Sequence, residues 1–116
     1  MINAHNWLVV RYKINQLKRL EHNLQNQNLN FYTPKITKKS YKTNAHKEVL
    51  LFPGYGFIKN GIKNIHSIKY TKGVIDVLKF GSNFAFLSNE KIIELTNAEK
   101  ISRKKPFCED FYENDK

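Results

Sequence analysis

The sequence predicts an α+β domain in which an antiparallel sheet carries helices mainly on one face. The first indication is the order of the elements, because segments rich in β-branched and aromatic residues alternate with segments of helical periodicity. The second is the composition: 116 residues, 41% of them hydrophobic, supply one modest core and leave little room for a second domain. No internal repeat is present.

The chain opens with a predicted strand and helix. Residues 7–12, WLVVRY, are bulky strand formers and predict a central strand. We expect Asn15 to cap a helix over residues 16–27. Three leucines give this helix one apolar stripe at positions i, i+3 and i+7. They are Leu17, Leu20 and Leu24.

Two further strands and a basic segment are predicted in the middle of the chain. Residues 31–36 form the first strand, and Pro34 within it indicates an edge position or an irregular ladder. Residues 37–47 are polar and rich in lysine, which predicts a mobile hairpin or loop. Residues 51–59 form the next strand, and Asn60-Gly61 is a strong turn signal after it.

The second half of the chain completes the order. We expect a short helix over residues 62–70, a β-branched strand over 74–80 and a short strand over 84–87. Residues 88–90, Ser-Asn-Glu, are typical of a helix start, and the periodicity is lost beyond about residue 100. The order β-α-β-β-α-β, followed by a short strand and a final helix, predicts the split β-α-β sandwich of ferredoxin-like domains.

Residues 51–58, LFPGYGFI, are free of charge on both sides of the expected strand. Alternation along a strand places successive side chains on opposite sides. One side carries Pro53, Tyr55 and Phe57, and the other carries Phe52 and Ile58. Because a small domain has one core, we expect the second side to be buried and the first to be an exposed docking surface.

The charge of the chain is unevenly distributed. The formal net charge is +10 and the sequence pI about 9.7, which favours polyanions such as nucleic acid, although a merely lysine-rich surface is the alternative. Residues 1–105 contain 19 Lys or Arg against 6 Asp or Glu, whereas residues 106–116 contain 1 against 4. We expect a folded domain over residues 1–100 and a charged, mobile tail over residues 101–116.

The polar face of the first predicted helix is a candidate nucleic-acid surface. It contains no acidic residue and offers guanidinium, imidazole and amide groups, which contact phosphates and base edges. The residues are Gln16, Arg19, His22, Asn23 and Asn26. An ordinary solvated helix face is the alternative.

No catalytic, metal or cofactor site is recognisable in the sequence. The four histidines lack metal-ligand spacing, and neither a glycine-rich phosphate loop nor a nucleophile motif is present. A single cysteine, Cys108, excludes an internal disulfide. Neither a membrane span of roughly 20 apolar residues nor a signal peptide is apparent. We expect a cytoplasmic protein that is not an enzyme, binds no cofactor and does not contact a membrane.

Several motifs resemble the N-terminal domain of the NusG family, the NGN domain. The most specific is FPGYGFI at residues 52–58, and TKGV at residues 71–74 with the later Phe80-Gly81 is nearly as informative. The resemblance covers residues 6–98. The helix that follows Tyr12-Lys13 is more similar to that of RfaH, the specialised operon-targeted branch, than to that of general NusG.

The resemblance implies a domain that binds RNA polymerase and regulates elongation. In this family an apolar sheet surface binds the clamp helices and a second contact reaches the gate loop. Holding the clamp closed suppresses pausing and promotes antitermination. The corresponding clamp-binding positions are Pro53, Tyr55, Phe57 and, less closely, Phe80. The gate-loop positions are Asn64, Ile65, His66 and Ser67, which lack the His-Thr run of RfaH.

The resemblance also implies a contact with the non-template DNA strand, which RfaH binds through basic and polar groups. The corresponding positions are Lys13, Gln16, Arg19, Thr71 and Lys72. Asn23 stands where RfaH has a helix histidine, and His22 lies one position earlier. We therefore expect the preferred DNA sequence to differ.

Two departures from the family pattern carry expectations of their own. Gly56 stands where relatives have a bulky aliphatic residue, so we expect Phe84 or Phe86 to fill the space. The chain ends before a KOW domain, so we expect no such domain and an unmasked docking surface that permits self-association. The alternative function is a small nucleic-acid-binding ferredoxin-like module that acts without RNA polymerase.

Overall fold

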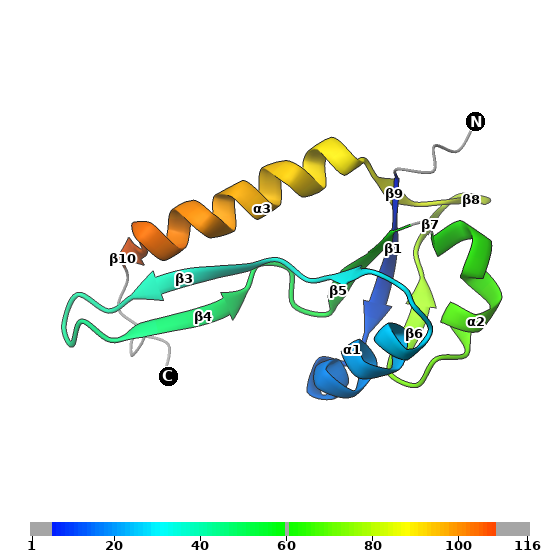
Figure 1. Ribbon diagram of the computed structural model, residues 1–116, viewed down its shortest axis with the longest axis horizontal. Helices are drawn as coiled ribbons and strands as arrows, with labels where there is room; N and C mark the ends of the chain where they lie inside the picture. The colour runs from blue at the N-terminus through cyan, green and yellow to red at the C-terminus, as the bar shows by residue number, and fades with distance from the viewer. Residues whose placement is uncertain (1–5, 60, 109–116) are drawn as a thin grey trace.

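The computed structural model describes residues 6–59 and 61–108, and a five-stranded sheet forms its centre (Figure 1). The strand order is β2-β5-β1-β6, and β9 also pairs with β1. Strand β1, Trp7–Tyr12, runs antiparallel to β5, β6 and β9. The predicted α+β fold with an antiparallel sheet is confirmed, and β1 is the central strand.

The neighbours of β1 bring distant segments together. Strand β5, Tyr55–Lys59, pairs with β1 over its whole length, and β2, Phe31–Tyr32, lies on the outer side of β5. Strand β6, Val74–Val77, lies on the other side of β1. Strand β9, Phe86–Leu87, lies beside the start of β1.

Two helices cover one face of the sheet. Helix α1, Leu17–Asn26, follows a 3-10 turn, η1, at Ile14–Gln16, and α2, Ile65–Lys69, follows a second such turn, η2, at Gly61–Asn64. The predicted cap at Asn15 is wrong, because the chain enters α1 through the 3-10 turn and no side chain caps either element. The leucine stripe is confirmed. Leu20 and Leu24 are buried with Leu8, Val10, Ile58 and Ile68 in the main core.

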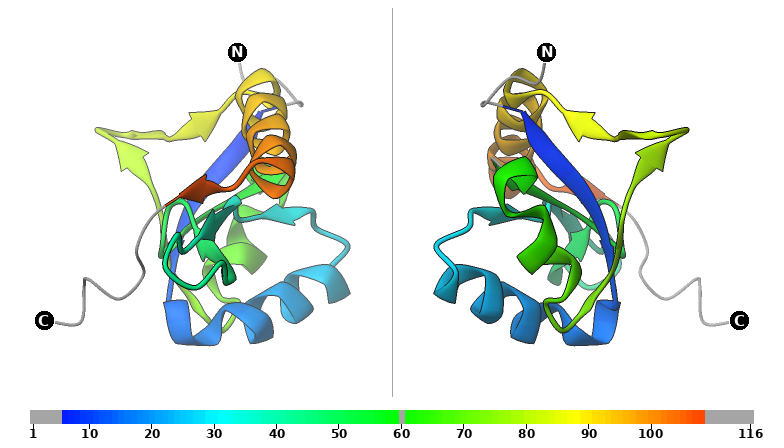
Figure 2. Two further views of the ribbon diagram at one scale, coloured as in Figure 1. Left: turned by 90° about the vertical axis from the view of Figure 1, so that its left-hand side faces the viewer. Right: turned by 90° about the vertical axis from the view of Figure 1, so that its right-hand side faces the viewer.

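Helix α3, Asn89–Lys104, lies on the opposite side of the sheet from α1 (Figures 1 and 2). The helix starts where predicted, and Ser88 caps it, since the Ser88 hydroxyl accepts a hydrogen bond from the Lys91 backbone N–H at 3.3 Å. Ile92 packs with Trp7 and Phe57 in a second core cluster. The helix continues to Lys104, past the loss of periodicity expected near residue 100.

A long hairpin extends from the central sheet. Strand β3, Lys35–Lys39, pairs with β4, His46–Leu50, so the basic segment of residues 37–47 is a hairpin. Pro34 interrupts the predicted strand and separates β2 from β3, as its position in the sequence indicated. Strand β10, Phe107–Cys108, pairs in parallel with β3. Asn60 of the predicted turn and the acidic residues 109–116 lie outside the described residues.

The predicted strands over residues 74–80 and 84–87 are each interrupted. The chain leaves the sheet after Val77 as a small hairpin made of β7, Lys79–Phe80, and β8, Asn83–Phe84. Hydrogen bonds to β1 flank this hairpin. Before it, the Leu78 N–H donates to the Val9 carbonyl at 3.0 Å, and after it, the Val9 N–H donates to the Ala85 carbonyl at 3.1 Å.

The predicted strand over residues 51–59 is wrong in its first half. Residues 51–54 form a turn in which Gly54 has a φ of +87°, a conformation that favours glycine, and the strand begins at Tyr55. The turn brings the Phe52 ring edge-on to the Phe57 ring, with 6.4 Å between centroids. The predicted core position of Phe52 on the Ile58 side is therefore also wrong.

The space beside Gly56 is filled by Phe31, so the expectation of Phe84 or Phe86 is wrong. A Cβ atom at Gly56 would lie 2.6 Å from Phe31 Cζ and 3.2 Å from Thr33 Cγ2. The Phe31 ring also packs edge-on against Tyr12, with 6.0 Å between centroids. Glycine at this position therefore lets an aromatic ring from the neighbouring strand β2 cross β5.

We predict that Gly56→Val lowers the free energy of unfolding by about 1–3 kcal/mol, because its side chain collides with Phe31. The double variant Gly56→Val with Phe31→Ala should be more stable than the sum of the two single changes implies, since the smaller residue vacates that space. Urea denaturation of the four proteins measures this coupling. Strictly additive losses would show that Phe31 does not determine the choice of glycine.

Candidate protein-binding groove and nucleic-acid surface

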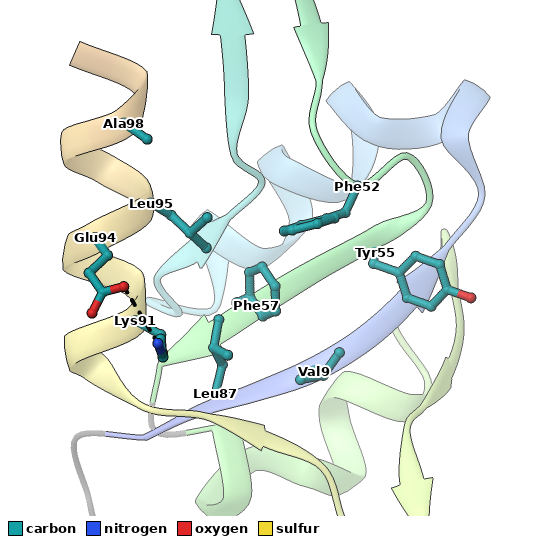
Figure 3. A pocket seen from close by; sticks show the side chains of 9 residues that line it. All are labelled: Val9, Phe52, Tyr55, Phe57, Leu87, Lys91, Glu94, Leu95 and Ala98. Carbon is teal, nitrogen blue, oxygen red and sulfur yellow. Dashed lines mark ion pairs between the residues drawn. The ribbon is translucent and has the colours of Figure 1, made fainter. Parts of the chain in front are cut away.

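An apolar groove of about 590 Å³ lies between the central sheet and α3 (Figure 3). Strands β1 and β5 form its floor, α3 forms one wall, and the turn before β5 and strand β9 complete it. Its lining residues are Val9, Phe52, Tyr55, Phe57, Leu87, Lys91, Glu94, Leu95 and Ala98.

Strand alternation and helix periodicity together place these side chains in the groove. Val9 and Phe57 are opposite each other in the β1–β5 register, so their side chains point to the same side of the sheet. On α3, Lys91, Leu95 and Ala98 recur at i, i+4 and i+7 and so share one helix face. The two apolar surfaces meet at an angle, and the groove lies between them.

The groove has a buried floor and a more exposed rim. Phe57 is 6% exposed, whereas Phe52 and Tyr55 are 42% and 39% exposed. On the helix side, the Lys91 ammonium and the Glu94 carboxylate form an ion pair at 3.5 Å in open solvent. An apolar floor with a partly polar rim is the usual anatomy of a protein-binding site.

The predicted clamp-binding residues do not all line the groove. Tyr55 and Phe57 line the groove, but Pro53 lies in a neighbouring depression beyond Tyr55. Phe80 is 75% exposed on the β7–β8 hairpin and does not line the groove. The expectation of a fully uncovered surface is wrong for Phe57, because Ile92 of α3 packs against it.

Sequence reasoning missed more than half of the groove. Val9 belongs to the strand that was predicted, and the spacing of Lys91, Leu95 and Ala98 is visible in the sequence, so both signals were available. Phe52 carried no such signal, because its position depends on the turn at Gly54.

Hydrogen bonds attach α3 to the sheet at both ends of the groove. The Trp7 indole N–H donates to Asn89 Oδ1 at 2.9 Å near the start of the helix. Farther along, the Tyr32 hydroxyl donates to the Glu99 carboxylate. Burial and this hydrogen bond raise the pKa of Tyr32 to about 12. The Trp7 and Tyr32 rings meet edge-on, with 6.3 Å between centroids.

The predicted nucleic-acid residues of α1 and of the turn at residues 71–73 lie together. The Lys13 N–H donates to the Gly73 carbonyl at 2.9 Å, which ties the entry of the helix to this turn. A Cβ atom at Gly73 would lie 3.3 Å from Leu20 Cβ and 3.8 Å from Gln16 Cβ, so the turn packs closely on the helix. The side chains of Lys13, Arg19, His22 and Lys72 are exposed, and those of Gln16 and Asn23 are half-buried.

Thr71 differs from the other predicted nucleic-acid residues because it is buried. Its hydroxyl donates to the Ser67 carbonyl at 2.8 Å and accepts a hydrogen bond from Gln27 Nε2 at 2.9 Å. The Thr71 hydroxyl is thus used for hydrogen bonds within the fold, and Thr71 positions the turn against the end of α1. The exposed cations around it are the groups that face solvent.

The predicted gate-loop residues begin α2. Ile65 packs against the main core, and the Ser67 hydroxyl donates to the Asn64 carbonyl at 3.1 Å. His66 is exposed, and its ring lies 5.0 Å from the ring of Tyr70, one turn later. This segment therefore lies on an element separate from the groove.

Within residues 6–59 and 61–108, no three His, Cys, Asp or Glu side chains lie close enough to hold a metal ion. No helix in that part of the chain is both long and apolar enough to cross a bilayer.

Comparison with known proteins places the chain in a family. A family model described as "Transcription termination factor nusG" matches residues 5–96, most of the chain. The chain belongs to the NusG family. Members of this family are transcription factors that bind RNA polymerase. No curated protein matches the sequence.

Removing the Tyr32 hydroxyl should weaken the attachment of α3 in this NusG-family domain. We predict that Tyr32→Phe lowers the free energy of unfolding by about 1–3 kcal/mol at neutral pH, because the Glu99 carboxylate loses the Tyr32 hydroxyl as a hydrogen-bond donor and keeps only the Lys35 N–H. The folded pKa of Tyr32, about 12, exceeds its ordinary value of 10.0. The folded protein therefore holds the proton more tightly, and this stabilisation is lost as the pH rises from 10 towards 12.

Urea denaturation of both proteins across this pH range provides the measurement. The stability difference between wild type and Tyr32→Phe should shrink as the pH rises, because the variant has no hydroxyl to ionise. A difference that stays constant between pH 8 and pH 12 would show that the Tyr32 proton does not contribute.

Proposed function

We propose that the apolar groove binds the clamp helices of RNA polymerase and that the protein acts as a transcription elongation and antitermination factor. The observation that carries this proposal is an apolar groove, open at the surface and rimmed by aromatic side chains, in a member of a polymerase-binding family. An amphipathic helix docks into such a groove by laying its apolar face on the floor.

The energetics favour a protein partner in the groove. Phe52 and Tyr55 are partly exposed in the free domain and would be desolvated by a docked helix. Burying one large apolar side chain contributes roughly 1.5–3 kcal/mol, and aromatic residues at the centre of an interface often dominate its affinity. The Lys91–Glu94 pair at the rim would select orientation more than strength.

Suppression of pausing follows if the bound protein favours one state of the polymerase. A ligand that binds the closed clamp better than the open clamp shifts the equilibrium by its difference in affinity. The start of α2, with exposed His66, is proposed to reach the gate loop as the second contact. We propose that three exposed cations, one just before η1, one on α1 and one in the neighbouring turn, hold the non-template strand, as in the RfaH branch. These are Lys13, Arg19 and Lys72.

The alternative is a nucleic-acid-binding module that acts without polymerase. The net charge of +10 favours this alternative. It leaves the apolar groove without a role, however, because nucleic-acid binding does not use an apolar surface of this kind. The two proposals differ in a simple observable, since only the first requires a complex with core RNA polymerase.

We predict that the double variant Phe52→Ala with Tyr55→Ala weakens binding to core RNA polymerase by about tenfold or more, because it removes both exposed aromatic rings of the groove. Phe57 is unsuitable for this test, since Phe57→Ala in the buried floor would cost about 3–5 kcal/mol of folding stability. Binding is measured by fluorescence anisotropy of the labelled domain titrated with core polymerase.

A matched control is available on the same chain. Tyr41 and Phe80 are one tyrosine and one phenylalanine, 60% and 75% exposed, and neither lines the groove. The variant Tyr41→Ala with Phe80→Ala should bind polymerase as the wild type does. Equal loss in both variants would contradict the groove assignment. A concentration-dependent dimer that disappears only in the groove variant would instead identify a second copy of the chain as an occupant.

The exposed cations Lys13, Arg19 and Lys72, which we call the α1 surface, generate a separate prediction. Arg19→Ala should weaken binding to single-stranded DNA and lower the slope of log affinity against log salt by about 0.7, the value for one phosphate contact on a single strand. Lys63→Ala, an exposed cation on η2, should leave both quantities nearly unchanged. The same slope change in both variants would indicate attraction by net charge alone.

A further inference from the structure

A second basic surface lies at one end of the molecule, and α2 and the β7–β8 hairpin lie towards the other (Figure 1). We call it the basic arm, and define it as the β3–β4 hairpin and the end of α3, residues 35–50 and 99–105. It contains nine Lys or Arg residues and two Glu residues. Neither the groove nor the α1 surface includes any of these cations.

Side chains of α3 hold the arm together along the edge of β3. The Lys35 N–H donates to Glu99 Oε1 at 3.2 Å, and the Thr37 N–H donates to Ser102 Oγ at 3.0 Å. Ser102 is 1% exposed, so this contact is sealed from solvent. Strand β10 continues along the same edge. The arm is therefore an ordered unit of two strands and a helix end.

The tip of the hairpin is also built by specific hydrogen bonds. The fully buried Ser40 accepts at its hydroxyl from the N–H groups of Lys42 and Thr43, at 3.3 and 3.4 Å. Asn44 takes a φ of +60° and donates its N–H to the Ser40 carbonyl at 2.8 Å. Tyr41 remains 60% exposed at the apex.

The strand register places cations on both faces of the ribbon. Lys38 lies opposite Lys47, and Lys39 lies opposite His46. Because adjacent residues point to opposite faces, Lys38 and Lys39 lead to different sides of the hairpin. One of the two acids, Glu99, already accepts hydrogen bonds from Tyr32 and from the Lys35 N–H. Positive charge therefore dominates the arm on both faces.

We propose that the basic arm binds the phosphate backbone of double-stranded DNA. A two-stranded ribbon fits the major groove of B-form DNA, about 12 Å wide, and lysines on both of its faces would meet the two phosphate walls. The major groove of A-form RNA is too narrow for side chains to read. Binding of single strands uses a row of stacked aromatic rings, and Tyr41 is the one exposed Tyr, Phe or Trp ring within residues 35–50 and 99–105.

The experiment uses the full chain and a short fluorescent DNA duplex, without polymerase, so its failure leaves the groove proposal standing. The arm variant carries Lys39→Gln, Lys47→Gln and Lys104→Gln, one change each in β3, β4 and α3. The control variant carries Lys63→Gln, Lys69→Gln and Lys79→Gln, three exposed lysines outside the arm, the groove and α1 with the same loss of charge. Affinity is measured over a series of salt concentrations.

We expect the arm variant to lose about tenfold or more in duplex affinity and to lower the salt slope by about 2–3, while the control changes affinity by less than about threefold. The charge-preserving triple Lys→Arg variant at the same arm positions should retain binding, which separates charge from fold. Equal losses in the arm and control variants would overturn the proposal. So would unchanged binding by the arm variant, or tighter binding of single-stranded DNA or of an RNA duplex.

Discussion

The attachment of α3 to the face of the sheet opposite α1 determines where the candidate protein-binding groove and the basic arm lie. Near its start, Ile92 packs on Trp7 and Phe57, and farther along Glu99 accepts the Tyr32 hydroxyl hydrogen bond. The helix thereby covers the floor aromatic but leaves room for the groove beside it. Its last turns lie along β3 and bring cations to the basic arm. One helix thus forms a wall of the protein-binding groove at one end and part of a charged surface at the other.

Local patterns predicted the elements whose signal is contained in a few neighbouring residues. The leucine stripe of α1, the start of α3 and the central strand are of this kind. The reading of residues 51–58 as one strand failed because strand alternation applies only where the backbone is extended, and Gly54 turns it. This error also moved Phe52 to the wrong side, and the groove could not be assembled without it.

Long-range contacts account for the remaining differences. The ring that fills the space beside Gly56 comes from β2, and no local pattern relates Phe31 to that glycine. Residue type alone also does not separate ligand-binding from structural polar groups. Thr71 and Glu99 resemble surface residues in the sequence, yet each is hydrogen-bonded within the fold. Exposed cations such as Arg19 are therefore the stronger candidates for nucleic-acid contacts.

The groove between the sheet and α3 is proposed to receive a helical segment of RNA polymerase. The most direct measurement is photo-crosslinking to core polymerase from a benzophenone amino acid placed at Phe52, on the groove rim, or at Phe80, outside it. We predict an adduct with the clamp helices from position 52 and none from position 80. An adduct from position 80 alone, or none from position 52 while the domain still binds polymerase, would contradict docking in the groove.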